Sequence, residues 1–308
     1  LALRAKSYDI GFTVDAEEAD RLDLSLDVIA AVFSDPELAG WQGYGLAIQA
    51  YQKRALLVVE WARELAHDVG RKMMVRLVKG AYWDSEVKWS QMDGFVDYPV
   101  FTSKAATDVS YIACAKYLLA NRDVLFPQFA THNAHTVATI LEIDNQQASP
   151  NREGYEFQRL HGMGESIYQQ VIAEQAVGCR IYAPVGEHED LLAYLVRRLL
   201  ENGANNSFVN NIVDKAVPLE SLLRDPVETV EAASGQRNQA IPLPQDIYRH
   251  SGSERSNRQN SRGFDLTDTK TLAHLSHGMD VFWGQHTASL LAQTNSITMT
   301  NPASRQET

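Results

Sequence analysis

The feature that most constrains the fold is a pattern that recurs six times between residues 7 and 201. Each unit is a short run rich in β-forming residues, then one or more polar residues, then a long amphipathic stretch. The predicted strands and helices are, in order, Ser7–Val14 with Ala16–Phe33, Gly45–Gln49 with Arg54–His67, Lys72–Val78 with Asp84–Ser90 and Ser103–Ala120, Phe126–Thr131 with His135–Asp144, Tyr155–Leu160 with Glu165–Glu174, and Arg180–Val185 with Leu191–Glu201. Strands that alternate with helices in this way pair in parallel through crossovers.

Polar residues stand where each predicted strand ends, and this favours a barrel. They are Asp15, Gln49, Lys79, His132 with Asn133, His161 and Tyr182. In a (β/α)8 barrel, all of these side chains meet at one mouth. A doubly wound open sheet is the alternative, but no Gly-x-Gly-x-x-Gly motif opens any predicted helix. We therefore predict an α/β protein with a TIM-like (β/α)8 barrel that is incomplete, with about six of the eight units present.

The composition of the chain changes after the sixth unit, and this change predicts three regions. Residues 1–210 form the partial barrel. Residues 211–263 contain four prolines and end in the polar stretch Ser251–Arg262, so they are predicted to be a linker. Residues 264–308 resume with a helix at Thr269–Met279 but are too short for a core of their own, which is typical of the start of a further domain.

Bulk composition excludes several classes of function. The longest apolar runs are too short for a membrane span, and a net charge of −11 argues against nucleic acid as a partner. Two cysteines are too few for a disulfide framework or a thiolate metal site, so a reducing compartment is expected. Because Leu1–Arg4 is neither an initiator methionine nor a signal peptide, we expect the chain to begin within a longer protein that supplies two further barrel units.

Two adjacent arginines, Arg197 and Arg198, interrupt an otherwise apolar stretch that is predicted to be a helix. At about 100° per residue they share one side of that helix with Tyr194 and Glu201. Paired guanidinium forks beside a tyrosine suit a small carboxylate. The alternative is a solvated face with an Arg197–Glu201 ion pair, and from this segment alone that interpretation is the stronger one.

The segment Arg76 to Asp84 ends a predicted strand with two cations, a glycine and two aromatic rings. Strand alternation places Arg76 and Lys79 on opposite faces unless the end of the strand bulges. Gly80 permits close backbone approach, and Tyr82 and Trp83 offer flat surfaces, a combination that suits a planar anionic cofactor. Ion pairs within a barrel strand explain the two cations equally well.

Other polar residues at strand ends allow more than one role. No carboxylate or thiolate stands in ligand spacing with His132 and His135, so no metal site is predicted, and His132 is expected to be a hydrogen-bond donor or a structural residue. Asp15 can cap the helix that follows it, and a role in the pocket is compatible with capping. Leu160 walls an apolar pocket or belongs to the core.

These residues and their order resemble the proline dehydrogenase domain of the bifunctional proline utilization A flavoenzymes. The matching segments are 12–22, 48–54, 76–84, 129–135, 160–165 and 180–208. The resemblance implies an FAD-containing barrel that oxidises L-proline to Δ1-pyrroline-5-carboxylate. It also implies that residues 241–308 lead into an aldehyde dehydrogenase domain whose NAD site lies beyond Thr308.

The resemblance also assigns roles to individual residues. It implies that Arg197 and Arg198 hold the proline carboxylate and that Asp15 is hydrogen-bonded nearby. The residues implied to enclose the proline ring are Ala81, Tyr82, Leu160, Tyr182 and Tyr194. The residues implied to surround the flavin are Gln49, Arg76, Lys79, Trp83, Thr102, His132, Asn133, Glu201 and Phe208.

Partners and location follow from the same resemblance. It implies a quinone as electron acceptor and a parent protein that is cytoplasmic and peripherally associated with the inner membrane, while the oligomeric state is left open. Two other functions compete: a flavin barrel related to methylenetetrahydrofolate reductase, and a truncated protein that has lost FAD. Proline-dependent bleaching of bound flavin distinguishes them.

Overall fold

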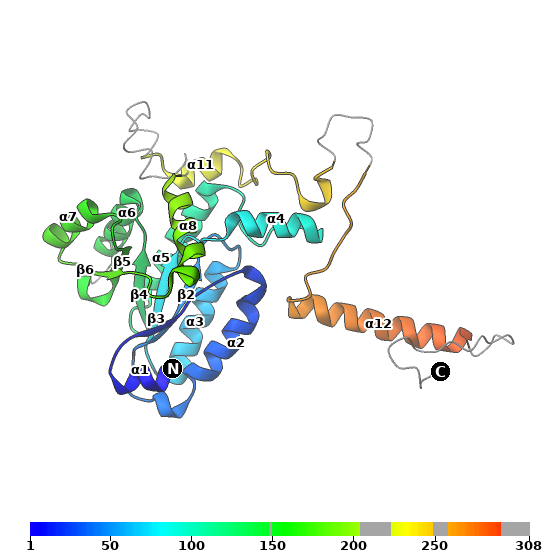
Figure 1. The fold of residues 1–308 in the computed structure, drawn as a ribbon, viewed down its shortest axis with the longest axis horizontal. Helices are drawn as coiled ribbons and strands as arrows, with labels where there is room; N and C mark the ends of the chain where they lie inside the picture. Colours follow the sequence, from blue (N-terminus) through cyan, green and yellow to red (C-terminus); the bar gives the residue numbers. More distant parts are fainter. Residues whose placement is uncertain (148–149, 204–222, 249–257, 291–308) are drawn as a thin grey trace. The chain divides into compact units, whose positions relative to one another are not determined.

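The computed structural model describes residues 1–147, 150–203, 223–248 and 258–290. The chain divides into two compact units, Leu1–Gly263 and Phe264–Thr308. The first unit contains one parallel six-stranded sheet whose strand order is β1-β2-β3-β4-β5-β6 (Figure 1). The strands are β1 (Phe12–Val14), β2 (Tyr44–Gln49), β3 (Met73–Val78), β4 (Leu125–Ala130), β5 (Glu156–Leu160) and β6 (Gly178–Tyr182).

Helices link successive strands, as the sequence pattern predicts. The linking helices are α2 (Leu22–Phe33), α3 (Ala55–Val69), α4 (Trp83–Asp93), α5 (Lys104–Ala120), α6 (Ala134–Asn145) and α7 (Glu165–Gln175). Helix α1 (Ala2–Ser7) precedes β1, α8 (His188–Gly203) and α11 (Pro226–Ala232) follow β6, and α12 (Thr269–Leu290) belongs to the second unit. Short 3-10 turns occur at η1 (Ala19–Arg21), η2 (Pro36–Leu38), η3 (Arg152–Gly154) and η4 (Pro244–Asp246).

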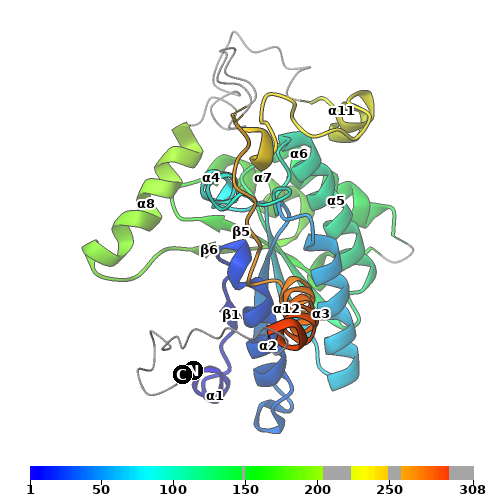
Figure 2. The same ribbon diagram turned by 90° about the vertical axis from the view of Figure 1, so that its right-hand side faces the viewer.

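The strand order decides between the two predicted architectures. Every strand pairs in parallel with the next strand of the chain, without the reversal that defines a doubly wound sheet. The sheet is a curled half-barrel, so the prediction of an incomplete TIM-like barrel is confirmed. Figure 2 shows α3 and α5 on one side of the sheet and α8 on the other.

Alternation along each strand creates an apolar outer face and a partly polar inner face. On β3, Met73, Val75 and Leu77 are fully buried in the core beneath α3 and α5, whereas Arg76 lies on the inner face and is partly exposed. The core is therefore the layer between the sheet and its covering helices. The side chains of the inner face are not part of this core and are available for a binding site.

The beginning of the chain differs from the prediction. Of the predicted strand Ser7–Val14, only Phe12–Val14 is extended, because Ser7 ends helix α1 and residues 8–11 form the connecting loop, and the predicted helix Ala16–Phe33 begins only at Leu22. Asp15 does not cap that helix, because the residue at its N-cap position is Arg21, and the Asp15 carboxylate instead accepts a hydrogen bond from Arg76. The acidic segment after Asp15 is instead tied to α4 by Glu86, whose Oε1 accepts the Ala19 N–H at 2.6 Å.

The segment after the barrel packs onto α4 and α5. The Tyr98 hydroxyl donates to Pro242 O at 2.6 Å, and Asn260 Nδ2 donates to Gln91 O at 2.7 Å. The Asn238 N–H donates to the Thr102 hydroxyl at 3.1 Å. Several residues in the region predicted to be a linker are therefore held against the barrel.

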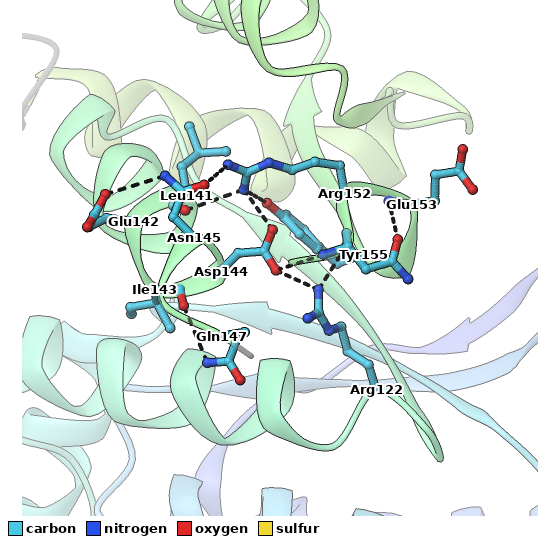
Figure 3. Close-up of polar contacts among 11 residues, drawn as sticks. Arg122, Leu141, Glu142, Ile143, Asp144, Asn145, Gln147, Arg152, Glu153 and Tyr155 are labelled. Carbon is cyan, nitrogen blue, oxygen red and sulfur yellow. Dashed lines mark hydrogen bonds and ion pairs between the residues drawn. The ribbon is translucent and has the colours of Figure 1, made fainter. Parts of the chain in front are cut away.

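A buried ion cluster closes the amino ends of β4 and β5 (Figure 3). The Asp144 carboxylate is fully buried and pairs with Arg122 at 2.7 Å and Arg152 at 2.8 Å. Arg152 also donates to the Tyr155 hydroxyl at 2.7 Å. This end of a barrel carries stability, whereas the carboxyl ends of the strands carry ligands.

Candidate functional site

The predicted polar residues gather at the carboxyl edge of the sheet. Asp15, Gln49, Lys79, His132 and Tyr182 each lie at or just after the end of a different strand. Because the strands are parallel, these ends share one edge. The five residues that the sequence singled out therefore lie along one edge of the sheet, as predicted.

Arg76 is held on the inner face by two bonds. Its Nε donates to Gln158 Oε1 at 2.9 Å, and its Nη1 donates to Asp15 Oδ1 at 3.0 Å. The Asp15 side chain is 76% exposed, so solvent screens that ion pair and it contributes about 0–1 kcal/mol to stability. Neither bond uses Nη2.

A buried carboxylate lies beneath Arg76 on the inner face. Oε1 of Glu156 accepts from Gln128 Nε2, Gln158 Nε2 and Arg180 Nε at 2.8, 2.9 and 2.8 Å, and its Oε2 accepts from Arg180 Nη2 at 2.9 Å. Burial raises the pKa of Glu156, but the hydrogen bonds from Arg180 and the two glutamines outweigh it and lower the pKa below its usual value. Glu156 is therefore a fixed anion whose oxygens are occupied.

This inner-face network is not among the sites predicted from the sequence, although the sequence carries a signal for it. Gln128, Glu156 and Gln158 stand at alternating positions of strands that should carry branched apolar residues on a barrel's inner face. Polar residues at such positions on neighbouring strands indicate a hydrogen-bonded network that crosses the sheet.

Gln49, Gly80 and Ala81 shape the ends of β2 and β3. The Gln49 amide is buried, donating to Glu17 O at 2.6 Å and accepting from the Ala81 N–H at 3.4 Å. Gly80 has φ +133°, and a Cβ there would lie 2.5 Å from the Tyr51 ring. Only glycine fits at position 80.

Lys79, Trp83 and Thr102 make contacts away from the inner face. Lys79 pairs with Asp108 of α5, so it lies on the opposite face of β3 from Arg76, as alternation predicts. The Trp83 indole N–H donates to Phe101 O at 2.9 Å, and Thr102 is buried under the Asn238 N–H. The two cations of β3 therefore have separate partners.

His132 is a neutral donor at the end of β4. Burial, together with the positive charges of Arg198 and Arg159, lowers the pKa of His132 to about 4. Its Nε2 accepts the Leu160 N–H at 3.0 Å, so the ring proton is on Nδ1. Leu160 itself is buried at the end of β5. Asn133 caps α6 by accepting the Thr136 N–H at 3.1 Å.

Helix α8, the double-arginine helix that carries Arg197 and Arg198, lies near the carboxyl edge of the sheet. The Arg197 guanidinium lies over the Tyr82 ring at 5.2 Å, and that of Arg198 lies over the Tyr194 ring at 5.3 Å. Within the described residues, the buried Arg197 Nε has no hydrogen-bond partner. The positive charge of Arg198 is also one of the causes that lower the pKa of His132 at the end of β4.

Three further residues of the predicted site are Tyr182, Glu201 and Phe208. Tyr182 ends β6 and accepts the His161 N–H through its carbonyl at 2.8 Å. The Glu201 side chain and all of Phe208 lie outside the described residues, and with them any Arg197–Glu201 pair.

Within the described part of the chain, no three His, Cys, Asp or Glu side chains are grouped to hold a metal ion. Among those residues, too, no helix combines the length and the hydropathy that crossing a bilayer requires.

Comparison with known proteins places this site in a family. A family model described as "Proline dehydrogenase" matches residues 1–211. The bifunctional proteins PutA of Salmonella typhimurium and Escherichia coli are 55% and 54% identical to this chain over 290 residues, which is 91% of the chain and 21% of each relative. A crystal structure of Bradyrhizobium japonicum proline utilization A matches with a TM-score of 0.82 and 55% identity, over 89% of this chain and 27% of that one.

The chain thus spans about a fifth of the length of these curated relatives. The family match covers the whole sheet and the double-arginine helix. The chain belongs to the proline dehydrogenase family.

Proposed function

We propose that the protein oxidises L-proline to Δ1-pyrroline-5-carboxylate with FAD, and that this chain supplies most of the pocket. Family membership supports the reaction class. The observation that carries the residue assignment is the convergence of Arg197 on Tyr82 and of Arg198 on His132 at one edge of the sheet.

The two arginines are proposed to anchor the substrate. The buried Arg197 Nε, which lacks a partner among the described residues, is a donor that a carboxylate would satisfy. The positive charge of both guanidinium groups also disfavours the ammonium form of proline. Loss of hydride requires the neutral amine, so the carboxylate anchor also favours the reactive form.

An apolar and aromatic wall is proposed to fix the ring. Its members are Ala81, Tyr82, Leu160, Tyr182 and Tyr194, with Asp15 beside them. Leu160 is buried and Tyr82 is stacked under Arg197, so both present fixed surfaces. Holding the ring carbon in one place is the main contribution that such residues make to rate.

The residues at the strand ends fit FAD. His132 offers a neutral N–H and Arg76 a cation, which together suit a planar ring system with carbonyl groups. When bound, FAD supplies the acceptor for the hydride that leaves C5 of proline. The residues proposed to hold it are Gln49, Arg76, Lys79, Gly80, Trp83, Thr102, His132, Asn133, Glu201 and Phe208.

The wider reaction sequence is part of the proposal. The PutA relatives are named bifunctional, so we propose that residues 264–308 begin an aldehyde dehydrogenase domain that uses NAD and carries proline carbon on to glutamate. Residues 1–210 are proposed as the barrel and residues 211–263 as the connection. Electrons would pass to a membrane quinone from a cytoplasmic protein that associates with the inner membrane.

One experiment tests the reaction. The full gene product is loaded with FAD and mixed without oxygen with L-proline or with NADH while flavin absorbance is recorded. We expect proline, but not NADH, to bleach the flavin. Bleaching by NADH alone would favour a methylenetetrahydrofolate reductase-like enzyme, and a protein that takes up no FAD would refute the proposal.

A further inference from the structure

The inner face of the sheet carries a chain of hydrogen bonds that ends at Arg76. Arg180 donates to Glu156, Gln158 donates to Glu156 and accepts from Arg76, and Gln158 is only 1% exposed. A barrel's inner layers are ordinarily filled by branched apolar side chains. Buried polar residues at these positions therefore need an explanation beyond packing.

The register shows how the chain crosses the sheet. Arg76, Gln128 and Glu156 stand side by side on β3, β4 and β5, and Gln158 is level with Ala130 one step higher. The small Ala130 side chain lies between Gln158 and β3. Gln158 thus bonds to an arginine on a strand that is not its neighbour.

The orientation of the Gln158 amide is determined by charge. Its NH2 group faces the Glu156 carboxylate, and its oxygen faces the Arg76 guanidinium. A reversed amide would place a donor against a cation and an acceptor against an anion. Because four hydrogen bonds hold Glu156 as an anion, only one orientation of Gln158 is stable.

We infer that Gln158 is a positioning residue for Arg76, and that Glu156 sets the direction of its amide. The inference rests on the proposed function, in which Arg76 faces the flavin. Asp15, the other partner of Arg76, is largely exposed, so the buried amide is the more rigid constraint on the guanidinium. Rigid support of this kind determines how accurately a charged group meets developing charge.

Gln128 provides a matched control. It donates to the same Glu156 oxygen at 2.8 Å and is 3% exposed, and although it stands beside Arg76 in the sheet, no hydrogen bond joins the two side chains within the described residues. Its own oxygen is buried without a partner among the described residues, whereas both ends of Gln158 are bonded. The same substitution at the two positions therefore separates positioning of Arg76 from packing.

Gln158→Met and Gln128→Met are compared in the FAD-loaded full gene product. In Gln158→Met we expect kcat for proline to fall about 10-fold, the KM for proline and the Kd for FAD to stay within about 2-fold, and the flavin reduction potential to become more negative. Gln128→Met should lose similar thermal stability but keep kcat and the potential. Equal shifts in both variants, or none in either, would overturn the inference.

Gln158→Glu gives an independent test in case the methionine variant does not fold. When protonated, the new carboxyl group donates to Glu156 and accepts from Arg76, which reproduces the native pattern. When it ionises, it repels Glu156. We expect a flavin potential and kcat close to those of the native protein at low pH that both fall as pH rises, relative to the unsubstituted protein.

A pH profile of Gln158→Glu that parallels that of the unsubstituted protein would contradict the positioning role. These outcomes are distinguishable from failure of the proposed function. If the unsubstituted protein is not bleached by proline, the function itself is wrong. If it is bleached and the Gln158 variants behave like Gln128→Met, only the inference fails.

Discussion

Single side chains at this site act through their surroundings. His132 illustrates the point, because burial and two neighbouring arginines keep it neutral while one backbone N–H fixes its tautomer. Arg197 and Arg198 differ from ordinary surface arginines in the same way, since each is stacked on a tyrosine ring. The residue types were readable from sequence, but these environments were not.

Arg198→Lys is expected to weaken proline binding about 10-fold or more while leaving FAD binding nearly unchanged. Lysine keeps the charge but loses the planar fork that matches two carboxylate oxygens. Titration with proline and with FAD, each followed by flavin absorbance or fluorescence, measures both constants. Equal loss of both affinities would argue against the carboxylate role.

His132→Gln is expected to change how stability depends on pH. The pKa of His132 is lowered to about 4 in the folded protein, while the unfolded chain protonates near the ordinary value of about 6.5. Folding therefore releases a proton between these values, so the stability of the native protein falls as pH drops through that window. Urea unfolding at several pH values should show a smaller acid loss in His132→Gln, and an identical slope would exclude this source.

Individual elements of the fold are held by buried charges at both ends of the sheet. At the amino ends, Asp144 joins the loops before β4 and β5. At the carboxyl ends, Glu86 of α4 accepts the Ala19 N–H of η1. Burial, with additional repulsion from Asp20 and Glu18, raises the pKa of Glu86.

Asp144→Asn is expected to lower the free energy of unfolding by about 3 kcal/mol, because two arginines then lie near a buried group that carries no charge. Urea denaturation measures this. Asn145→Ala is the control, since Asn145 contacts Arg152 in an exposed position and should cost less than about 1 kcal/mol. Comparable losses would mean that Asp144 contributes only as an acceptor.

Glu86→Gln is expected to stabilise the protein at neutral pH. The amide oxygen can still accept the Ala19 N–H, while the buried charge and its repulsion by Asp20 are removed. Because the folded pKa is raised, the native carboxyl loses stability as pH rises above its unfolded pKa. The gain in melting temperature should therefore vanish in acid, and a gain that is independent of pH would point to another cause.

Prediction from sequence succeeded where a segment's own composition determines its structure. All six strands were found, because each is a β-rich run followed by polar residues. The predicted start of helix α2 was wrong, because Glu86, far along the chain, accepts the Ala19 N–H and holds this segment in a different conformation. The Arg76, Gln158 and Glu156 network escaped notice for the same reason, because its bonds join strands separated by many residues.

The strands of the sheet differ in how well their backbone amides are protected from solvent. Among the described strands, β1 and β6 each have one neighbour, and β6 is largely exposed, whereas β2 is buried throughout. Hydrogen exchange should therefore be slowest in β2, β3 and β4 and fastest in β1 and β6. Mass spectrometry of exchanged peptides measures this order, and uniform protection would show that both edges are covered.

The sequential strand order has a consequence for biosynthesis. Each new strand docks beside the one made just before it, so the partner it needs has already left the ribosome. The nascent chain can thus extend its sheet in a single direction during translation. Synonymous codon changes that pause synthesis between two strands should be tolerated, because every arrested chain ends on an assembled layer.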